Sequence, residues 1–243
     1  MPGQDDRPTD DRRADDRRAR DPDREEGRRY PQVRFSVPPG ATEILLVRHG
    51  ESAPADPERP FPLVEGRSDP ALAPEGRVQA EQLADRLVAS QIDAIIHTPL
   101  RRTAETAAPL AVRLDIVPAT EPLMIEVHLG EWEGGIYRKR IAEGDPLAAK
   151  IFQEERWDIV PGAESNESVA ERVRTAIDRI AERHPAQRVV LVAHGGTIGA
   201  AIALASGSRP FAFLGSDNGA ISTIVVSGDR WFVRGYNDRS HLD

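Results

Sequence analysis

The hydrophobic positions of this chain fall into short apolar runs separated by longer amphipathic stretches. Continuous apolar runs occupy residues 44–47, 94–96 and 189–193. Such runs are typical of strands that are covered on both faces of a sheet. Because the stretches between them have helical spacing, the pattern predicts an α/β fold with a largely parallel sheet.

Helical spacing of apolar residues marks four of the intervening segments. We expect helices behind Pro74, after Thr98 as N-cap, behind Ser165, and after the glycine pair Gly195 and Gly196. Near the end of the chain, two apolar runs flank residues 227–229. This last segment predicts a β-hairpin that closes the sheet.

The first 36 residues differ in composition from the rest of the chain. Up to Arg34 they contain equal numbers of acidic residues and arginines, and few apolar side chains. Such a segment buries too little apolar surface to offset its ordering entropy, so residues 1–36 are predicted to be a disordered charged tail. The tail is either a tether for a partner or a solvated extension, including one from a start site assigned too far upstream, and we favour the extension. Residues 37–243 are then one globular domain.

Composition and charge exclude several classes of protein. Because the chain has no cysteine, disulfides, thiolate metal sites and a cysteine nucleophile are excluded. We expect no membrane span, since no apolar run reaches about 18 residues, and no signal peptide. The net charge of −8 argues against nucleic-acid or anionic-membrane binding but is compatible with a local basic pocket. We therefore expect a cytoplasmic protein, with a homodimer as the general expectation for its oligomeric state.

Two predicted strands end in the same way, with a histidine followed by glycine. His49 and Gly50 follow one apolar run, and His194 and Gly195 follow another. Ligands of open α/β sheets bind beyond the carboxyl ends of strands, and glycine lets the backbone approach an anion closely. Either histidine alone would be read as an ordinary loop residue, but the repeated context predicts a shared site. A metal ion is the alternative for paired histidines, and it is disfavoured because Arg48 adjoins His49 and no helical His-Glu-x-x-His spacing occurs.

Two arginines and a carboxylate complete the candidate chemistry. Arg101 and Arg102 stand in the first turn of the helix expected after Thr98. A cation there opposes the helix dipole unless an anion binds at that end. We interpret Arg101 as solvent-facing and Arg102 as anion-binding. Glu126 lies between apolar residues and is a candidate general acid, a weak signal when taken alone.

The order of these segments resembles that of the histidine phosphatase superfamily, also called the phosphoglycerate mutase-like family, over nearly all of residues 43–241. The matching segments are 46–52 (Leu-Val-Arg-His-Gly-Glu-Ser), 66–72 (Gly-Arg-Ser-Asp-Pro-Ala-Leu), 99–107, 126–134, 161–165 and 192–196. The fold expected with this resemblance is a three-layer α/β/α sandwich with a mostly parallel central sheet. Residues 136–160 are then expected to form a small helical cap over the pocket.

The resemblance implies a phosphohistidine mechanism that uses no metal and no other cofactor. His49 would attack the phosphoryl group, and Arg48, Arg102 and His194 would surround its oxygens. Glu126 would protonate the leaving alkoxide and then activate the water that hydrolyses the phosphohistidine. The substrate-binding residues implied in this way are Arg48, Gly50, Glu51, Ser52, Arg102, His194 and Gly195.

Departures from the family pattern favour a phosphatase over a mutase. The chain lacks the Trp-Asn pair that the family's mutases carry after Ser52, and it lacks their long basic insertion. Thr98 stands where serine is commoner, which is a mild change because both side chains carry a hydroxyl. We expect a cytoplasmic phosphomonoesterase that acts on a small phosphorylated metabolite. A phosphoglycerate mutase-type phosphotransferase and a non-catalytic phospho-ligand-binding or scaffold protein are the alternatives.

Residues near the expected cap have two interpretations. Phe152 and Trp157 either contact the substrate or pack the cap onto the sheet, and Arg156 is a further candidate contact. The basic residues 138–140 could attract an anionic substrate, but we interpret them as a solvated turn. Asn218 could reach the pocket, and we interpret it as a turn residue.

Overall fold

The computed structural model describes residues 30–242. The chain divides into two compact units, Met1–Ser36 and Val37–Asp243. In the first unit the described residues 30–36 are exposed and form no helix or strand. Most of the predicted disordered tail lies outside the described residues, so that part of the interpretation stays a prediction.

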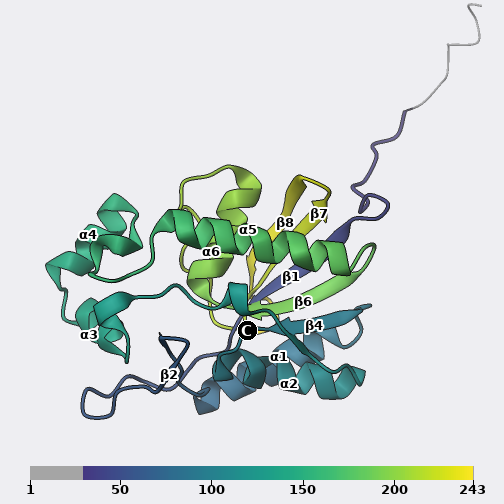
Figure 1. Cartoon of the computed structure of the whole chain (residues 1–243). Helices are drawn as coiled ribbons and strands as arrows, with labels where there is room; N and C mark the ends of the chain where they lie inside the picture. Colours follow the sequence, from purple (N-terminus) through teal and green to yellow (C-terminus); the bar gives the residue numbers. More distant parts are fainter. Residues whose placement is uncertain (1–29, 243) are drawn as a thin grey trace, which may run out of the picture. The chain divides into compact units, whose positions relative to one another are not determined.

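The second unit is built around a mixed sheet of six strands, and the predicted largely parallel sheet of an α/β fold is confirmed (Figure 1). In spatial order these are β5 (Ala119–Thr120), β4 (Ala94–His97), β6 (Arg188–Ala193), β1 (Thr42–Arg48), β7 (Ile221–Ser227) and β8 (Arg230–Asp238). The first four are parallel to one another, and β7 is antiparallel to both of its neighbours. The predicted strands and the closing hairpin are thereby confirmed. Two short strands, β2 (Leu63–Val64) and β3 (Arg67–Ser68), pair separately.

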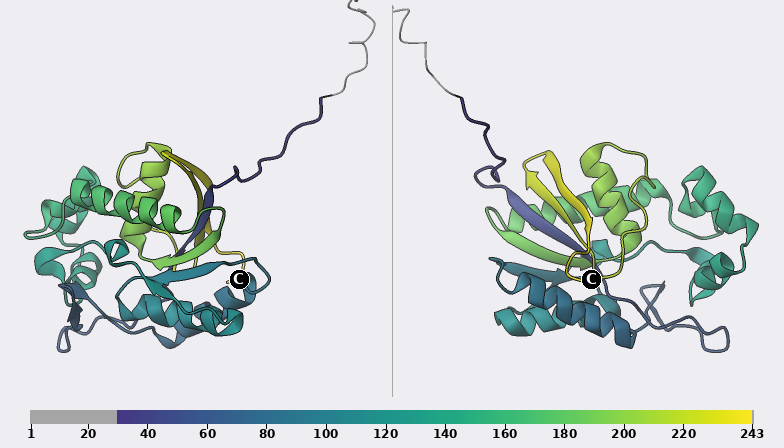
Figure 2. Two further views of the ribbon diagram at one scale, coloured as in Figure 1. Left: turned by 45° about the vertical axis from the view of Figure 1, so that its right-hand side comes forward. Right: turned by 180° about the vertical axis from the view of Figure 1, so that it is seen from behind.

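Helices cover both faces of this sheet and complete the three layers. The helices α1 (Pro74–Leu87) and α2 (Arg101–Leu114) pack on one face, and α5 (Asn166–Arg183) and α6 (Gly195–Ser206) on the other (Figures 1 and 2). Successive side chains of β1 belong alternately to the two hydrophobic cores. Ile44 and Leu46 join the core under α5 and α6, whereas Leu45 and Val47 join the core under α1 and α2. This double burial is the physical reason for the uninterrupted apolar runs.

The beginnings of the helices agree with the sequence signals in two cases and not in a third. Pro74 is the first residue of α1, and the Ser165 hydroxyl accepts a bond from the Ser168 amide at the start of α5 (3.2 Å). The expectation that Thr98 caps the next helix is wrong, because α2 begins at Arg101 with Leu100 as N-cap. Thr98 precedes a proline, which disfavours helical backbone, and its hydroxyl is engaged with His194 instead.

Residues 136–160 form the small helical cap that was expected. It consists of α3 (Ile136–Ala142), α4 (Pro146–Glu154) and the 3₁₀ turn η4 (Trp157–Ile159). The cap lies beyond the carboxyl ends of the parallel strands (Figures 1 and 2). Two further 3₁₀ turns, η2 (Pro122–Met124) and η3 (Gly130–Trp132), flank the segment that carries Glu126. Within residues 30–242, no helix has the length and apolar character needed to cross a membrane.

Candidate active site

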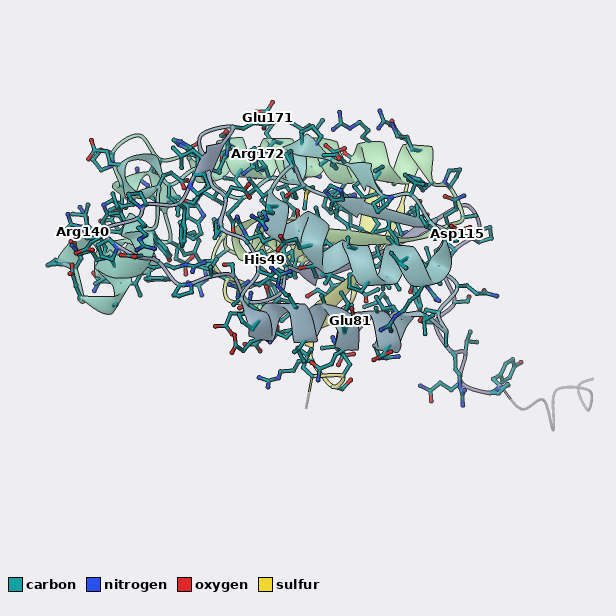
Figure 3. All side chains as sticks on the ribbon, turned by 90° about the horizontal axis from the view of Figure 1, so that it is seen from below. His49, Glu81, Asp115, Arg140, Glu171 and Arg172 are labelled. Atoms are coloured by element: carbon teal, nitrogen blue, oxygen red, sulfur yellow. The ribbon has the colours of Figure 1, made fainter. Side chains whose placement is uncertain are left out.

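A cavity of about 410 Å³ opens at the carboxyl ends of the parallel strands. Arg48 and His49 enter it from the end of β1, Gly195 from the end of β6, Arg102 from the first turn of α2, and Glu126 from the loop after η2. His49 lies between the sheet and the cap, on which Arg140 is labelled in Figure 3. The chain's topology therefore brings together residues that are far apart in the sequence.

His49 is a buried imidazole with one nitrogen held by the backbone. Its side chain is 5 % exposed, and Nδ1 lies 2.7 Å from the carbonyl oxygen of Gly50. A carbonyl can only accept, so Nδ1 carries the proton and Nε2 keeps its lone pair. Burial, followed by the charges of Arg102 and Arg48, lowers the pKa of His49 well below its ordinary value of 6.5. His49 is therefore a neutral imidazole at physiological pH, as a nucleophile must be.

His194 lies directly against His49, with the ring centres 5.3 Å apart and the rings edge to face. Its side chain is fully buried, and Nε2 lies 2.8 Å from the Thr98 hydroxyl. Nδ1 is buried and has no hydrogen-bond partner among the described residues. Burial, followed by the charge of Arg102, lowers the pKa of His194 well below 6.5. A buried ring nitrogen without a partner is the kind of atom that a bound ligand satisfies.

Two arginines bring positive charge to the same place without carboxylate partners. Arg102 is 6 % exposed and donates to the carbonyl oxygen of Ser68 (2.8 Å). Burial lowers its pKa to about 10, against the opposing effect of the Glu126 carboxylate, so it remains charged at neutral pH. Arg48 donates from Nη1 to the carbonyl oxygen of Ser216, while its Nε is buried and unbonded within residues 30–242. Two guanidinium groups that form no ion pair with a carboxylate within residues 30–242 are suited to bind an anion.

The Glu126 carboxyl group is fixed by two backbone amides. Oε1 accepts from the amide of Val127 (2.9 Å), and Oε2 accepts from the amide of Gly196 in the first turn of α6 (3.4 Å). A Cβ atom at position 196 would lie 2.6 Å from Oε1, so the helix can approach the carboxyl group only with glycine there. This geometry fixes a carboxyl group, a side chain that can transfer a proton, at the wall of the cavity.

Arg172 of α5, which is labelled in Figure 3, donates hydrogen bonds to the chain segment that carries Glu126. Its Nη1 donates to the carbonyl oxygens of Leu123 and Ile125, at 2.7 Å each, and its Nη2 to that of Glu126 at 3.4 Å. Its Nε donates to the carboxylate of Glu164 (2.7 Å). Burial would raise the pKa of Glu164, but the hydrogen bonds and charge of Arg172 hold it below its ordinary value. The sequence did not reveal this role, which depends on how α5 packs against a distant loop.

The structure separates some of the expected substrate-binding residues from the main cavity. Glu51 and Ser52 line a second cavity of about 440 Å³, which shares Arg48 and His49 with the first but not Glu126. The amide of Gly50 is engaged with the Thr106 hydroxyl (3.0 Å). Gly195, in contrast, lines the main cavity beside Arg48.

Arg138 is a residue of the site that sequence reasoning missed. It lines both cavities and donates to the carbonyl oxygen of Ala53 (2.7 Å) and to the Ser52 hydroxyl (2.6 Å). Its guanidinium carbon lies 5.4 Å from the centre of the Phe61 ring. Residues 138–140 lie in α3 and not in a turn. Arg138 is exposed, as expected, but it lines both cavities, whereas its basic neighbours form surface ion pairs, and no local pattern distinguishes it from them.

Three residues of the cap and Asn218 had two interpretations each, as contacts of the pocket or as structural residues. Phe152 and Trp157 line the main cavity, and Trp157 also packs against Phe211 with ring centres 4.7 Å apart. Arg156 pairs with Asp158 at the surface and does not line the main cavity. Asn218 stands in a turn as expected, and its side chain also donates to the carbonyl oxygen of His49 (2.8 Å). In residues 30–242, no three histidine, aspartate or glutamate side chains are arranged to hold a metal ion.

Comparison with known proteins gives matches along most of the chain. Residues 44–239 match the profile of the histidine phosphatase superfamily (branch 1). Over 210 residues the chain is 33 % identical to phosphoglycerate mutase-like protein 4 of Arabidopsis thaliana, covering 83 % of this chain and 87 % of that protein. Over 206 residues it is 31 % identical to the metal-independent phosphoserine phosphatase of the same plant, covering 83 % of each. The solved structure of a mycobacterial glucosyl-3-phosphoglycerate phosphatase is 28 % identical and has a TM-score of 0.68, covering 81 % of this chain and 99 % of the other.

Proposed function

This chain belongs to the histidine phosphatase superfamily and is a phosphatase, and we propose that it hydrolyses small phosphate monoesters through a phosphohistidine at His49. The observation that carries the proposal is the contact between a neutral imidazole and an unpaired anion site. His49 keeps a free lone pair on Nε2, and among the described residues the guanidinium groups of Arg48 and Arg102 form no ion pair with a carboxylate. A phosphoryl group supplies the missing negative charge and the electrophile together.

In the first step, Nε2 of His49 attacks phosphorus while the bond from phosphorus to the alcohol oxygen breaks. The proton of the Glu126 carboxyl group moves to the departing alkoxide, which leaves as a neutral alcohol. Arg48 and Arg102 stabilise the charge on the phosphoryl oxygens, and Nδ1 of His194 donates to one of them. The buried Nδ1 without a partner supports this assignment.

In the second step, the Glu126 carboxylate takes a proton from water as the water oxygen attacks phosphorus. The bond between Nε2 of His49 and phosphorus breaks, and inorganic phosphate leaves. His49 returns to its neutral form, and Glu126 is again protonated. No step needs a metal ion, because the arginines supply the positive charge.

Labelling of the protein with a ³²P-labelled phosphate monoester tests the intermediate. We expect acid-labile label on the wild-type protein and none on His49→Ala. The matched control is His184→Ala, which removes a histidine at the end of α5 that does not line the main cavity. Label or turnover that survives in His49→Ala would overturn the assignment, as would loss of turnover on addition of EDTA.

A mutase remains the second candidate because one relative is named a phosphoglycerate mutase-like protein. The two activities differ in the acceptor of the phosphoryl group, which is water in one case and a phosphoglycerate hydroxyl in the other. Incubation of the labelled phosphoenzyme with 2- and 3-phosphoglycerate separates them. Release of inorganic phosphate faster than interconversion of the isomers is expected, and the reverse order would favour the mutase.

A further inference from the structure

The position of Glu126 shows on which side of His49 the substrate's alcohol part lies. Two cavities meet at Arg48 and His49, and only the main one is lined by Glu126. If Glu126 protonates the leaving oxygen, as in the proposed function on which this inference rests, the alcohol must extend into the main cavity. The chemistry of that cavity's walls then decides which alcohols fit.

Aromatic side chains from several elements line the main cavity. They are Phe61 from the loop before β2, Trp132 from η3, and Tyr137, Phe152 and Trp157 from the cap. Leu214, from the loop after α6, adds an aliphatic side chain. Tyr137 connects the two tryptophans, with ring centres 6.2 Å from that of Trp132 and 6.5 Å from that of Trp157. Trp132, Tyr137 and Trp157 therefore form a connected aromatic cluster in the lining of the main cavity.

The charged side chains on this side of the cavity are already bonded within the protein. Arg67 donates to the carbonyl oxygens of Glu126 (3.2 Å) and Glu65 (2.9 Å) and lies 3.6 Å from the Glu164 carboxylate. Glu133 accepts from the Ser68 amide (2.8 Å) and hydroxyl with one oxygen, and from the Leu129 amide (2.8 Å) with the other. Both residues thus brace the cavity wall.

Arg138 stands at the rim and is also engaged. Two of its nitrogens donate to Ala53 and Ser52, and its guanidinium plane neighbours the Phe61 ring. A carboxylate or ammonium group on the substrate's alcohol would have to displace such bonds or lose its hydration without replacement. Either outcome is costly in a site walled by aromatic rings.

We propose that the preferred substrate is the phosphate monoester of an uncharged alcohol that carries an aromatic ring or an apolar group of similar size. The phosphate binds between Arg48, His49 and Arg102, and the ring lies against the cap. Phosphoserine and phosphoglycerates, whose alcohols carry charges, are then poor substrates. This chain therefore differs from the relatives that are named for those compounds.

A comparison of four alkyl phosphates tests the proposal with the full-length protein. The probes are 2-phenylethyl phosphate, O-phosphoserine, 3-phosphoglycerate and methyl phosphate, which are all alkyl rather than aryl esters. We expect kcat/KM for 2-phenylethyl phosphate to exceed the values for phosphoserine and 3-phosphoglycerate by about tenfold or more. A higher kcat/KM for either charged substrate would overturn the proposal.

The variant Phe152→Ala removes part of the apolar wall without touching the phosphate site. Its side chain is 48 % exposed, so the change is compatible with folding. We expect kcat/KM for 2-phenylethyl phosphate to fall about threefold to tenfold and that for methyl phosphate to stay the same. Leu147→Ala is the matched control, because Leu147 lies on the same helix, is 37 % exposed and does not line the main cavity. An equal loss for both substrates, or an equal loss in the control, would contradict the assigned role of Phe152.

Binding measurements keep this inference separate from the proposed catalytic mechanism. Calorimetry with 2-phenylethylphosphonate and methylphosphonate requires no turnover and no phosphohistidine. We expect the phenylethyl compound to bind about tenfold more tightly to the wild-type protein and to His49→Ala. Equal affinities would overturn the apolar site even if every ester were hydrolysed. A clear preference in the absence of any phosphoenzyme would retain it and reject the mechanism.

Discussion

Replacement of Thr98 by valine tests how the second histidine of the site is held. The Thr98 hydroxyl lies 2.8 Å from Nε2 of His194 and 2.9 Å from the Thr103 hydroxyl, and all three side chains are fully buried. If Nδ1 of His194 donates to the phosphoryl group, Nε2 must accept, and Thr98 is then its donor. Valine has nearly the shape of threonine but no hydroxyl, so the variant removes the donor.

The expected loss of kcat/KM follows from the buried Nε2 of His194, which valine leaves without a hydrogen-bond donor. A buried acceptor that loses its partner costs about 1–3 kcal/mol. The lost donor also removes the preference for a proton on Nδ1, so part of the population no longer donates to the phosphoryl group. Because about 1.4 kcal/mol corresponds to a factor of ten, kcat/KM is expected to fall about tenfold to hundredfold if the loss appears in the transition state.

Steady-state hydrolysis of 4-nitrophenyl phosphate and urea unfolding measure the two consequences separately. Thr98→Ser keeps the hydroxyl and is expected to retain kcat/KM within about threefold of the wild type. A valine variant with wild-type kcat/KM would refute the reasoning, and so would a serine variant as impaired as valine. A loss of stability without a loss of kcat/KM would show that the hydrogen bonds of the threonine hydroxyl stabilise the fold and do not act in catalysis.

Three further predictions concern the two histidines of the site and the residues that position Glu126. Burial, followed by the charge of Arg102, lowers the pKa of both His49 and His194, so only the unfolded chain takes up protons at these sites as the pH falls below 6.5. Above about pH 6.5 these two groups should not affect the free energy of unfolding. Below pH 6.5 the free energy of unfolding should decrease by up to about 1.4 kcal/mol per pH unit for each histidine. A free energy of unfolding in urea that does not change with pH in this range would contradict the prediction. Gly196→Ala would place Cβ 2.6 Å from the Glu126 carboxylate and should lower kcat at least about tenfold, whereas an unchanged kcat would show that the helix can withdraw. Arg172→Met releases the loop that carries Glu126 and should lower kcat while leaving the affinity for inorganic phosphate unchanged, as calorimetry can check.

The buried strands β1, β4 and β6 could be predicted from the sequence because their apolar runs report burial on both faces of the sheet, whereas the short, exposed β5 has no such run and was not predicted. Ile44 and Leu46 lie in one core and Leu45 and Val47 in the other, so the run has no polar position. The start of α2 could not be predicted in the same way. Thr98 looks like a capping residue, but it bonds to His194, which lies 96 positions along the chain. A local rule fails where a distant side chain takes its hydrogen bond.

In the candidate site, too, residues with a local sequence signal could be predicted, and residues whose role depends on tertiary packing could not. His49, His194 and Arg102 were predicted because they stand at strand ends or in the first turn of a helix, where topology alone delivers them to the sheet's edge. The parts played by Gly196 and Arg172 were not predicted. They depend on how closely α6 and α5 approach the loop with Glu126, and no spacing along the chain encodes that distance.

Charge by itself does not tell a ligand-binding residue from a structural one in this chain. Arg67 and Arg138 line the same cavity as Arg48 and Arg102, yet their donors are directed to carbonyl, hydroxyl or carboxylate oxygens of the protein's own walls. Among the described residues, the buried Nε of Arg48 has no hydrogen-bond partner, and Arg102 forms no ion pair with a carboxylate. An anion gains most where the fold leaves donors unsatisfied, and an apolar group gains most where they are satisfied. The pattern of pairing therefore supports the proposed placement of the phosphate near Arg48 and Arg102 and of the uncharged alcohol at the cap.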